Sequence, residues 1–133
     1  MHKQIIFLAL AAVVMVAWAC KPNVKEEAYK TVGVDEFEQL VERGDSVTVL
    51  DVRTPQEFAE GHLREAILID ANNDDFLSIA CDSLPKDKII AVYCRSGRRS
   101  AKAANLLSAE GYTAVNLDGG IIAWTKAGKD TIR

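Results

Sequence analysis

From about residue 28 onward, short apolar runs alternate with segments whose apolar residues recur at helical spacing. The run "KIIAVYC" (88–94) is almost continuously apolar, as expected for a strand buried on both faces of a sheet. In residues 34–44, Val34, Phe37 and Leu40 share one face of a helix that stops at Gly44. The whole pattern predicts strands at 29–32, 46–52, 65–70, 88–94 and from 113, and helices at 34–44, 54–61, 74–84, 100–111 and 121–128.

The segment 54–61 has the clearest helix start of the chain. Thr54 can cap it, Pro55 suits the first helical position, and Glu57 completes a Thr-x-x-Glu capping box. The alternation of strands and helices predicts an α/β fold, with a mostly parallel sheet of about five strands and helices on both faces. Ligands of such sheets bind beyond the carboxyl ends of the strands. Cys94 ends a buried strand, so we expect a site there.

The N-terminus has a different pattern. Residues 5–19 form an unbroken apolar run that follows one lysine and ends in small residues. This pattern is typical of a secretory signal peptide at 1–19. The run is shorter than the about 20 residues that cross a membrane. "AWAC" resembles a bacterial lipobox, which implies that Cys20 is lipidated. Residues 20–27 are then a lipid-anchored tether, and residues 28–133 form the domain on the periplasmic or cell-surface side. Cleavage after Ala19 without a lipid, or an uncleaved anchor, are the alternatives.

The composition is that of one ordinary globular domain, with 133 residues of which 49% are hydrophobic. The net charge of −3 argues against a nucleic-acid partner. His2 and His62 lie far apart and no zinc-ligand spacing is present, so we expect no metal and no cofactor. An exported domain would contain two cysteines, Cys81 and Cys94, in a compartment where disulfides can form. The sequence does not decide whether these two form one.

The loop "CRSGRRS" gives Cys94 an unusual environment. Three arginines follow it closely, and the next predicted helix points its free N–H groups back at the loop. Nearby cations and a helix N-terminus both lower the pKa of a thiol. Gly97 gives the backbone freedom to turn N–H groups toward an anion, and the hydroxyls of Ser96 and Ser100 add donors. The alternative is a small buried thiol beside a solvated basic turn.

Three motifs in order resemble the rhodanese-like sulfurtransferases. They are "LDVRTPQEFAEGHLREA" (50–66), the loop "CRSGRRS" (94–100) and "LDGGIIAWTKAG" (117–128). The resemblance covers about residues 28–130. One departure is clear: the family commonly has "GHIxGA" where this chain has "GHLREA", so that Glu65 stands in place of a glycine.

The resemblance implies that Cys94 takes a sulfane sulfur from a donor such as thiosulfate, forms a persulfide, and passes the outer sulfur to cyanide or a thiol. The acceptor would be a small molecule or a protein. Two groups of residues would surround the nucleophile. The loop residues expected to bind the donor's anionic end are Arg95, Ser96, Gly97, Arg98 and Arg99, and the residues expected to support the site from below are Asp51, Arg53 and Glu57. His62 is expected to be a structural turn residue, and Trp124 and Phe58 to lie in the core.

Two other functions fit parts of the pattern. Phosphatases with a cysteine in an anion-binding loop have arginine six residues after the cysteine, but here that residue is Ser100 and Arg99 is the fifth. The loop is therefore one residue short for a phosphoryl group, which needs a matched arginine fork. A non-catalytic sulfur carrier or a thiol-redox module at the membrane remains the main alternative, because a fold alone does not determine function.

Overall fold

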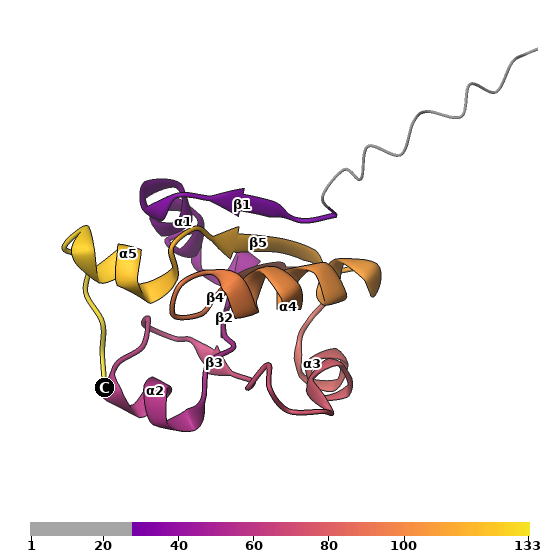
Figure 1. The fold of residues 1–133 in the computed structure, drawn as a ribbon. Coiled ribbons are helices and arrows are strands. Elements are labelled where there is room, and N and C mark those ends of the chain that lie inside the picture. Colours follow the sequence, from indigo (N-terminus) through magenta and orange to yellow (C-terminus); the bar gives the residue numbers. More distant parts are fainter. Residues whose placement is uncertain (1–27) are drawn as a thin grey trace, which may run out of the picture.

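The computed structural model describes residues 28–133, and it confirms the predicted α/β fold. Five strands form one sheet in the order β1-β5-β4-β2-β3, and every neighbouring pair is parallel (Figure 1). Because all strands run the same way, their carboxyl ends lie at one edge of the sheet. The strands are β1 (Lys30–Val32), β2 (Val47–Asp51), β3 (Ile67–Leu68), β4 (Ile89–Tyr93) and β5 (Thr113–Leu117).

Helices connect the strands and cover both faces of the sheet, as the alternating pattern predicted. They are α1 (Val34–Val41), α2 (Pro55–Glu60), α3 (Phe76–Ser83), α4 (Arg98–Ala109) and α5 (Gly120–Lys126), with a short 3₁₀ turn η1 (Gly44–Ser46).

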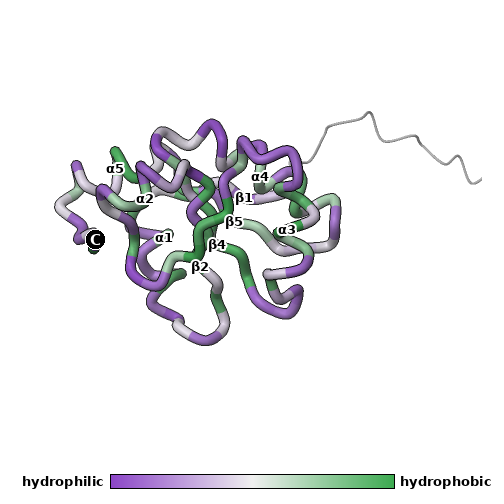
Figure 2. Tube along the Cα trace, turned by 90° about the horizontal axis from the view of Figure 1, so that it is seen from below, coloured by the Kyte–Doolittle hydropathy of each residue, from purple (hydrophilic) through white to green (hydrophobic). Residues whose placement is uncertain are grey.

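The side chains of the central strand β4 alternate between two hydrophobic clusters. Ile90 and Val92 pack with residues of α3 and α4 on one face. Ala91 and Tyr93 pack with residues of α1 and α5 on the other. Figure 2 shows the hydrophobic colour concentrated on the central strands β2 and β4. Burial on both faces accounts for the continuous apolar run at 88–94.

Two element boundaries differ from the prediction. Helix α4 begins at Arg98 rather than near Ser100, because Gly97 takes a left-handed conformation (φ 101°) and is its N-cap. The strand expected at 65–70 is reduced to the two residues of β3. Glu65 has a φ of 63°, which is incompatible with an extended strand and delays its start.

The segment before β3 is held by local contacts. Helix α2 has the predicted capping box, with the Thr54 hydroxyl accepting from the Glu57 N–H at 3.2 Å. His62 has the structural role expected of it. Its backbone N–H donates to the Ile132 carbonyl, and the Ile132 N–H donates to the His62 carbonyl, both at 2.8 Å. Its ring stacks on Phe58, with the centroids 3.7 Å apart. Phe58 is therefore a half-buried partner of His62 rather than a core residue.

Trp124 is buried as expected, at 6% exposure, and packs edge-on against Phe37. Within residues 28–133, no helix is long and apolar enough to span a membrane. The predicted signal peptide at 1–19, the lipidation site Cys20 and the tether at 20–27 lie outside the described residues.

Candidate active site

Cys94 follows β4 directly and is almost completely buried, with 1% of its surface exposed. Its Sγ atom accepts a hydrogen bond from the Gly97 N–H at 3.1 Å and from the Ser100 hydroxyl at 3.3 Å. Both donors come from the loop and the first turn of α4, the element that follows the strand. The thiol therefore lies at the carboxyl edge of the sheet, under the N-terminus of α4.

These donors favour the thiolate form. Burial alone raises the pKa of the Cys94 thiol, but the hydroxyl of Ser100 and the backbone N–H groups of Ser100, Gly97 and Ser96 outweigh burial and bring the pKa below its ordinary value. The pKa of Arg99 is raised by its hydrogen bond to Glu57 and also by the charge of Cys94, so this arginine favours the thiolate as well. The N-cap of α4 is Gly97, and the fully buried hydroxyl of Ser100 donates to the sulfur, as the sequence predicted for this side chain.

The diglycine at the start of α5, with Gly119 as N-cap and Gly120 as the first helical residue, packs against the Cys94 loop. The N–H groups of Ile121 and Ile122 donate to the carbonyls of Cys94 and Arg95, at 2.9 and 3.2 Å. This approach requires glycine at position 120, because a Cβ there would lie 2.4 Å from the Arg95 carbonyl oxygen. With these carbonyls held by α5, the N–H groups of the loop are left for the sulfur. This packing gives the Gly-Gly of the third motif its physical role.

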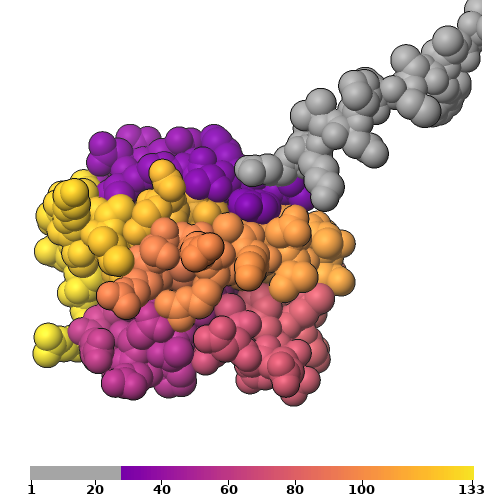
Figure 3. Space-filling view, viewed as in Figure 1, coloured from indigo at the N-terminus to yellow at the C-terminus, as the bar shows by residue number. Residues whose placement is uncertain are grey.

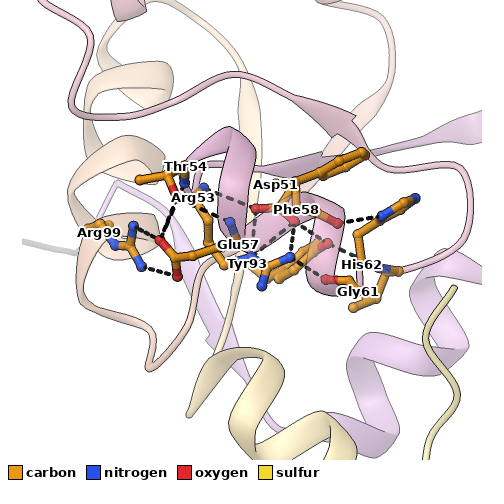
Figure 4. A network of polar contacts seen from close by, with 10 residues as sticks. Asp51, Arg53, Thr54, Glu57, Phe58, Gly61, His62, Tyr93 and Arg99 are labelled. Atoms are coloured by element: carbon orange, nitrogen blue, oxygen red, sulfur yellow. Dashed lines mark hydrogen bonds and ion pairs between the residues drawn. The ribbon is translucent and has the colours of Figure 1, made fainter. Parts of the chain in front are cut away.

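The three arginines of the loop have different surroundings. Arg99 forms a bidentate pair with Glu57, with its two terminal nitrogens 2.8 and 2.9 Å from the carboxylate oxygens (Figure 4). The hydrogen bond to Arg99 lowers the pKa of Glu57 to about 2. Arg95 and Arg98 are exposed and have no ion-pair partner among the described residues. They are the loop guanidiniums that remain available to an anion.

A second carboxylate–guanidinium pair lies in the interior below the site. Asp51 accepts from Arg53 Nε at 3.0 Å and from Arg53 Nη2 at 2.7 Å. The hydroxyl of Tyr93 donates to Asp51 at 2.5 Å and accepts from the Leu63 N–H at 3.0 Å (Figure 4). Burial, followed by the charge of Asp51, raises the pKa of Tyr93 well above its ordinary value. Arg53 also donates to the Gly61 carbonyl at 2.7 Å, which ties β2 and β4 to the loop after α2.

The three residues expected to support the site, Asp51, Arg53 and Glu57, thus belong to two separate ion pairs. Asp51 and Arg53 are brought together, whereas Glu57 pairs with Arg99 on another element. Tyr93 was not singled out, because within the run "KIIAVYC" it looks like one more strand residue. Its only sequence signal is a hydroxyl in a strand that is otherwise apolar, since such a group requires a buried partner.

A groove of about 400 Å³ borders the loop at Arg95. The side chains of α2 and α5 form its walls, with Glu57 and Glu60 on one side and Ile121 and Ile122 on the other. Figure 3 shows the segments of α2 (magenta), α4 (orange) and α5 (yellow) meeting at the surface. Cys81 lies elsewhere, on α3, where it is exposed; it is not bridged to Cys94. Residues 28–133 hold no cluster of three metal-ligating side chains.

Known proteins resemble this chain in sequence and in fold. The model of the rhodanese-like domain matches residues 33–127. A sulfurtransferase of Allochromatium vinosum is 40% identical over 85 residues, which cover 63% of this chain and 77% of the relative. Thiosulfate sulfurtransferase 18 of Arabidopsis thaliana is 34% identical over 114 residues, which cover 77% of this chain and 82% of the relative.

The crystal structure of a rhodanese-related protein from Thermoplasma volcanium superposes with a TM-score of 0.65 at 31% identity, covering 78% of this chain and 98% of the other. The relatives support sulfur transfer in general. The family model, the relatives and the shared fold all lead to the same conclusion: the chain belongs to the rhodanese-like family.

Proposed function

We propose that this protein is a thiosulfate sulfurtransferase that works through a persulfide on Cys94. The observation that supports this most is the environment of the Cys94 sulfur, which accepts from Gly97 and Ser100 and has a lowered pKa. The thiolate needs no general base in this arrangement. His62, the one histidine of residues 28–133, has its ring Nδ1 2.9 Å from the Phe58 carbonyl rather than at the sulfur.

The reaction has two half-reactions. The Cys94 thiolate attacks the outer sulfur of thiosulfate, a new S–S bond forms, and the old S–S bond breaks with its electron pair leaving on sulfite. The persulfide is anionic, so the loop N–H groups that stabilise the thiolate also suit its terminal sulfur. Cyanide or a thiolate then attacks that sulfur and releases Cys94 as a thiolate. The accumulation of a covalent intermediate predicts ping-pong kinetics.

The donor's sulfonate end binds Arg95 and Arg98 in this proposal. Both are exposed, and Arg95 lines the groove beside the loop. Arg99, which the sequence analysis placed with them, is held by Glu57 and supports the loop from the side. A phosphatase is disfavoured by the length of the loop, because Ser100 stands six residues after Cys94, where a phosphatase has the arginine that grips the phosphoryl group.

The test is thiocyanate formation from thiosulfate and cyanide by the full chain. We expect activity that Cys94→Ser abolishes and that Cys81→Ser leaves unchanged. Mass spectrometry after thiosulfate treatment should show a gain of one sulfur on Cys94. If the reduced protein makes no thiocyanate although an alkylating agent labels Cys94, the proposal is wrong and a sulfur-carrier or thiol-redox role is favoured.

We also propose, from the sequence of residues 1–27, that the protein is exported and anchored to a membrane by lipid on Cys20. The anchor would keep the domain at a membrane surface, where a protein acceptor could take its sulfur. Mass spectrometry of the membrane-extracted protein tests this proposal. Acylated Cys20 as the first residue is the expected result, and Cys20→Ala should release the domain from the membrane fraction.

A further inference from the structure

The sheet leaves part of one edge open, away from Cys94. On its inner side β2 pairs with β4 along all five of its residues, from Val47 to Asp51. On its outer side β3 pairs only with Leu50 and Asp51. The outer edge of residues 47–49 therefore has no strand partner among residues 28–133. Open strand edges present backbone N–H and C=O groups that can pair with another chain.

A groove of about 540 Å³ lies along this open edge, and we call it the edge groove. Part of its lining is apolar and comes from four elements or loops: Val41, Leu63, Ile67 and Trp124. Ile67 is 41% exposed, which is high for a large aliphatic side chain. None of residues 94–99 lines the edge groove, so it is separate from the active site.

The charged residues of the edge groove are mainly acidic. Carboxylates reach it from three segments that are far apart in sequence, namely Glu42 after α1, Glu65 before β3 and Asp130 after α5. These three have no ion-pair partner among the described residues, whereas a fourth, Glu38, is bound to Lys129 at 2.8 Å. Arg64 is the one cationic side chain in the lining. The field of the groove therefore favours a cationic occupant.

We propose that the edge groove binds an extended segment of a partner protein in which apolar residues alternate with lysine or arginine. Such a segment adds to residues 47–49 as a short strand. Its backbone groups pair with the open edge, and the two-residue period of a strand sends alternate apolar side chains toward the apolar lining. The long basic side chains between them can reach Glu42, Glu65 and Asp130. This inference goes beyond sulfur transfer and does not depend on it.

Glu65 offers a way to separate binding from folding. It is the only residue other than glycine with a positive φ in the described part of the chain. A left-handed conformation is strained for glutamate but not for glycine. Glu65→Gly should therefore remove a carboxylate from the groove and at the same time raise the melting temperature. Glu65→Gln removes the charge and keeps the strain.

The binding test uses the full chain in non-ionic detergent and two synthetic peptides of five residues with blocked ends. One peptide alternates lysine with valine, and the other alternates glutamate with valine. We expect calorimetry to detect binding of the lysine peptide, and this binding to weaken at high salt. In NMR spectra, the peptide should shift the amide signals of residues 47–49 and the indole signal of Trp124. The proposal is wrong if the glutamate peptide binds equally well, or if the shifts lie elsewhere.

The variants test the same proposal at one position. Glu65→Gln and Glu65→Gly should each weaken binding about two- to fivefold, the range expected for one exposed ion pair. Glu110→Gln, which changes an exposed carboxylate outside the groove, should leave binding unchanged. Cys94→Ser should also bind normally, so a failure of the sulfurtransferase proposal would not affect this test. Wild-type affinity in Glu65→Gly, or an equal loss in Glu110→Gln, would overturn the proposal.

Discussion

Two carboxylate–guanidinium pairs flank the Cys94 loop, and their environments differ sharply. The side chains of Asp51 and Arg53 are 0% and 6% exposed and belong to a network that includes Tyr93. The side chains of Glu57 and Arg99 are 25% and 28% exposed. The first pair joins two residues of one segment, whereas the second joins α2 to α4.

The difference in burial separates a structural role from an electrostatic one. A buried charge that loses its partner stays in a medium of low polarity, which costs several kcal/mol. A pair at the surface is screened by water and salt and contributes about 1 kcal/mol or less. We therefore expect the Asp51–Arg53 pair to stabilise the structure beneath the site. The Glu57–Arg99 pair should mainly determine how much positive charge the loop presents.

The largest effect should follow from breaking the buried pair. Asp51→Ala leaves the Arg53 guanidinium without its carboxylate and the Tyr93 hydroxyl without its acceptor. We expect the free energy of unfolding to fall by about 3–5 kcal/mol. Urea denaturation measures this loss, and Glu57→Gln is the matched control at the exposed pair, where the loss should stay below about 1 kcal/mol. Equal losses in the two variants would contradict the assignment of roles.

Removal of the Tyr93 hydroxyl should have the next largest effect on stability. Tyr93→Phe leaves the buried Leu63 N–H without a partner and removes one of the hydrogen bonds that Asp51 Oδ2 accepts, which should cost about 1–3 kcal/mol. Tyr112→Phe is the control on the other face of the sheet. The Tyr112 hydroxyl lies 2.9 Å from the carbonyl of Leu84 and 3.4 Å from that of Ala80, and both acceptors are neutral, so we expect a smaller loss of about 1 kcal/mol. A larger loss in Tyr112→Phe would show that the charge of Asp51 is not what makes Tyr93 important.

The sequence predicted the buried pair better than the exposed one for a physical reason. Asp51 ends an apolar strand, so its burial and its need for a nearby partner could be inferred from local pattern alone. Arg99 and Glu57 are 42 residues apart, and their contact depends on how α2 packs beside α4. Nothing in the spacing of the loop arginines distinguishes Arg99 from Arg95. The sequence therefore predicted where the cations gather but not which of them is already paired.

The same limit applies to the activation of Cys94. Its place between strand and helix followed from the alternation of elements, which the structure confirms. The donors to its sulfur, by contrast, depend on a left-handed Gly97 that starts α4 two residues early and turns Ser100 inward. Backbone conformations of this kind are tertiary details, as is the positive φ of Glu65 that shortens β3. Periodicity predicts elements and misses such single residues.

Breaking the exposed pair should change activity more than stability. Glu57→Gln keeps a side chain that can complete the capping box but frees Arg99 to attract an anion. We expect the KM for thiosulfate to fall about two- to fivefold at low salt, and the gain to shrink as salt is added. In an Arg99→Gln background the same change should have no such effect, which a double-mutant cycle measures. An undiminished gain in that background would mean that Glu57 acts on another cation.

The smallest effect is a pH dependence of the stability that the exposed pair contributes. Arg99 lowers the pKa of Glu57 from 4.5 to about 2, so the folded state binds this proton less readily than the unfolded chain. The stability from the pair is complete above pH 4.5 and disappears as the pH falls toward 2. Because a quarter of each side chain is exposed and screened, we expect less than about 1 kcal/mol. The difference in unfolding free energy between wild type and Glu57→Gln, measured by urea denaturation, should therefore narrow across this window. A difference that stayed constant with pH would mean that hydrogen-bond geometry, which glutamine can partly reproduce, rather than charge holds α2 against α4.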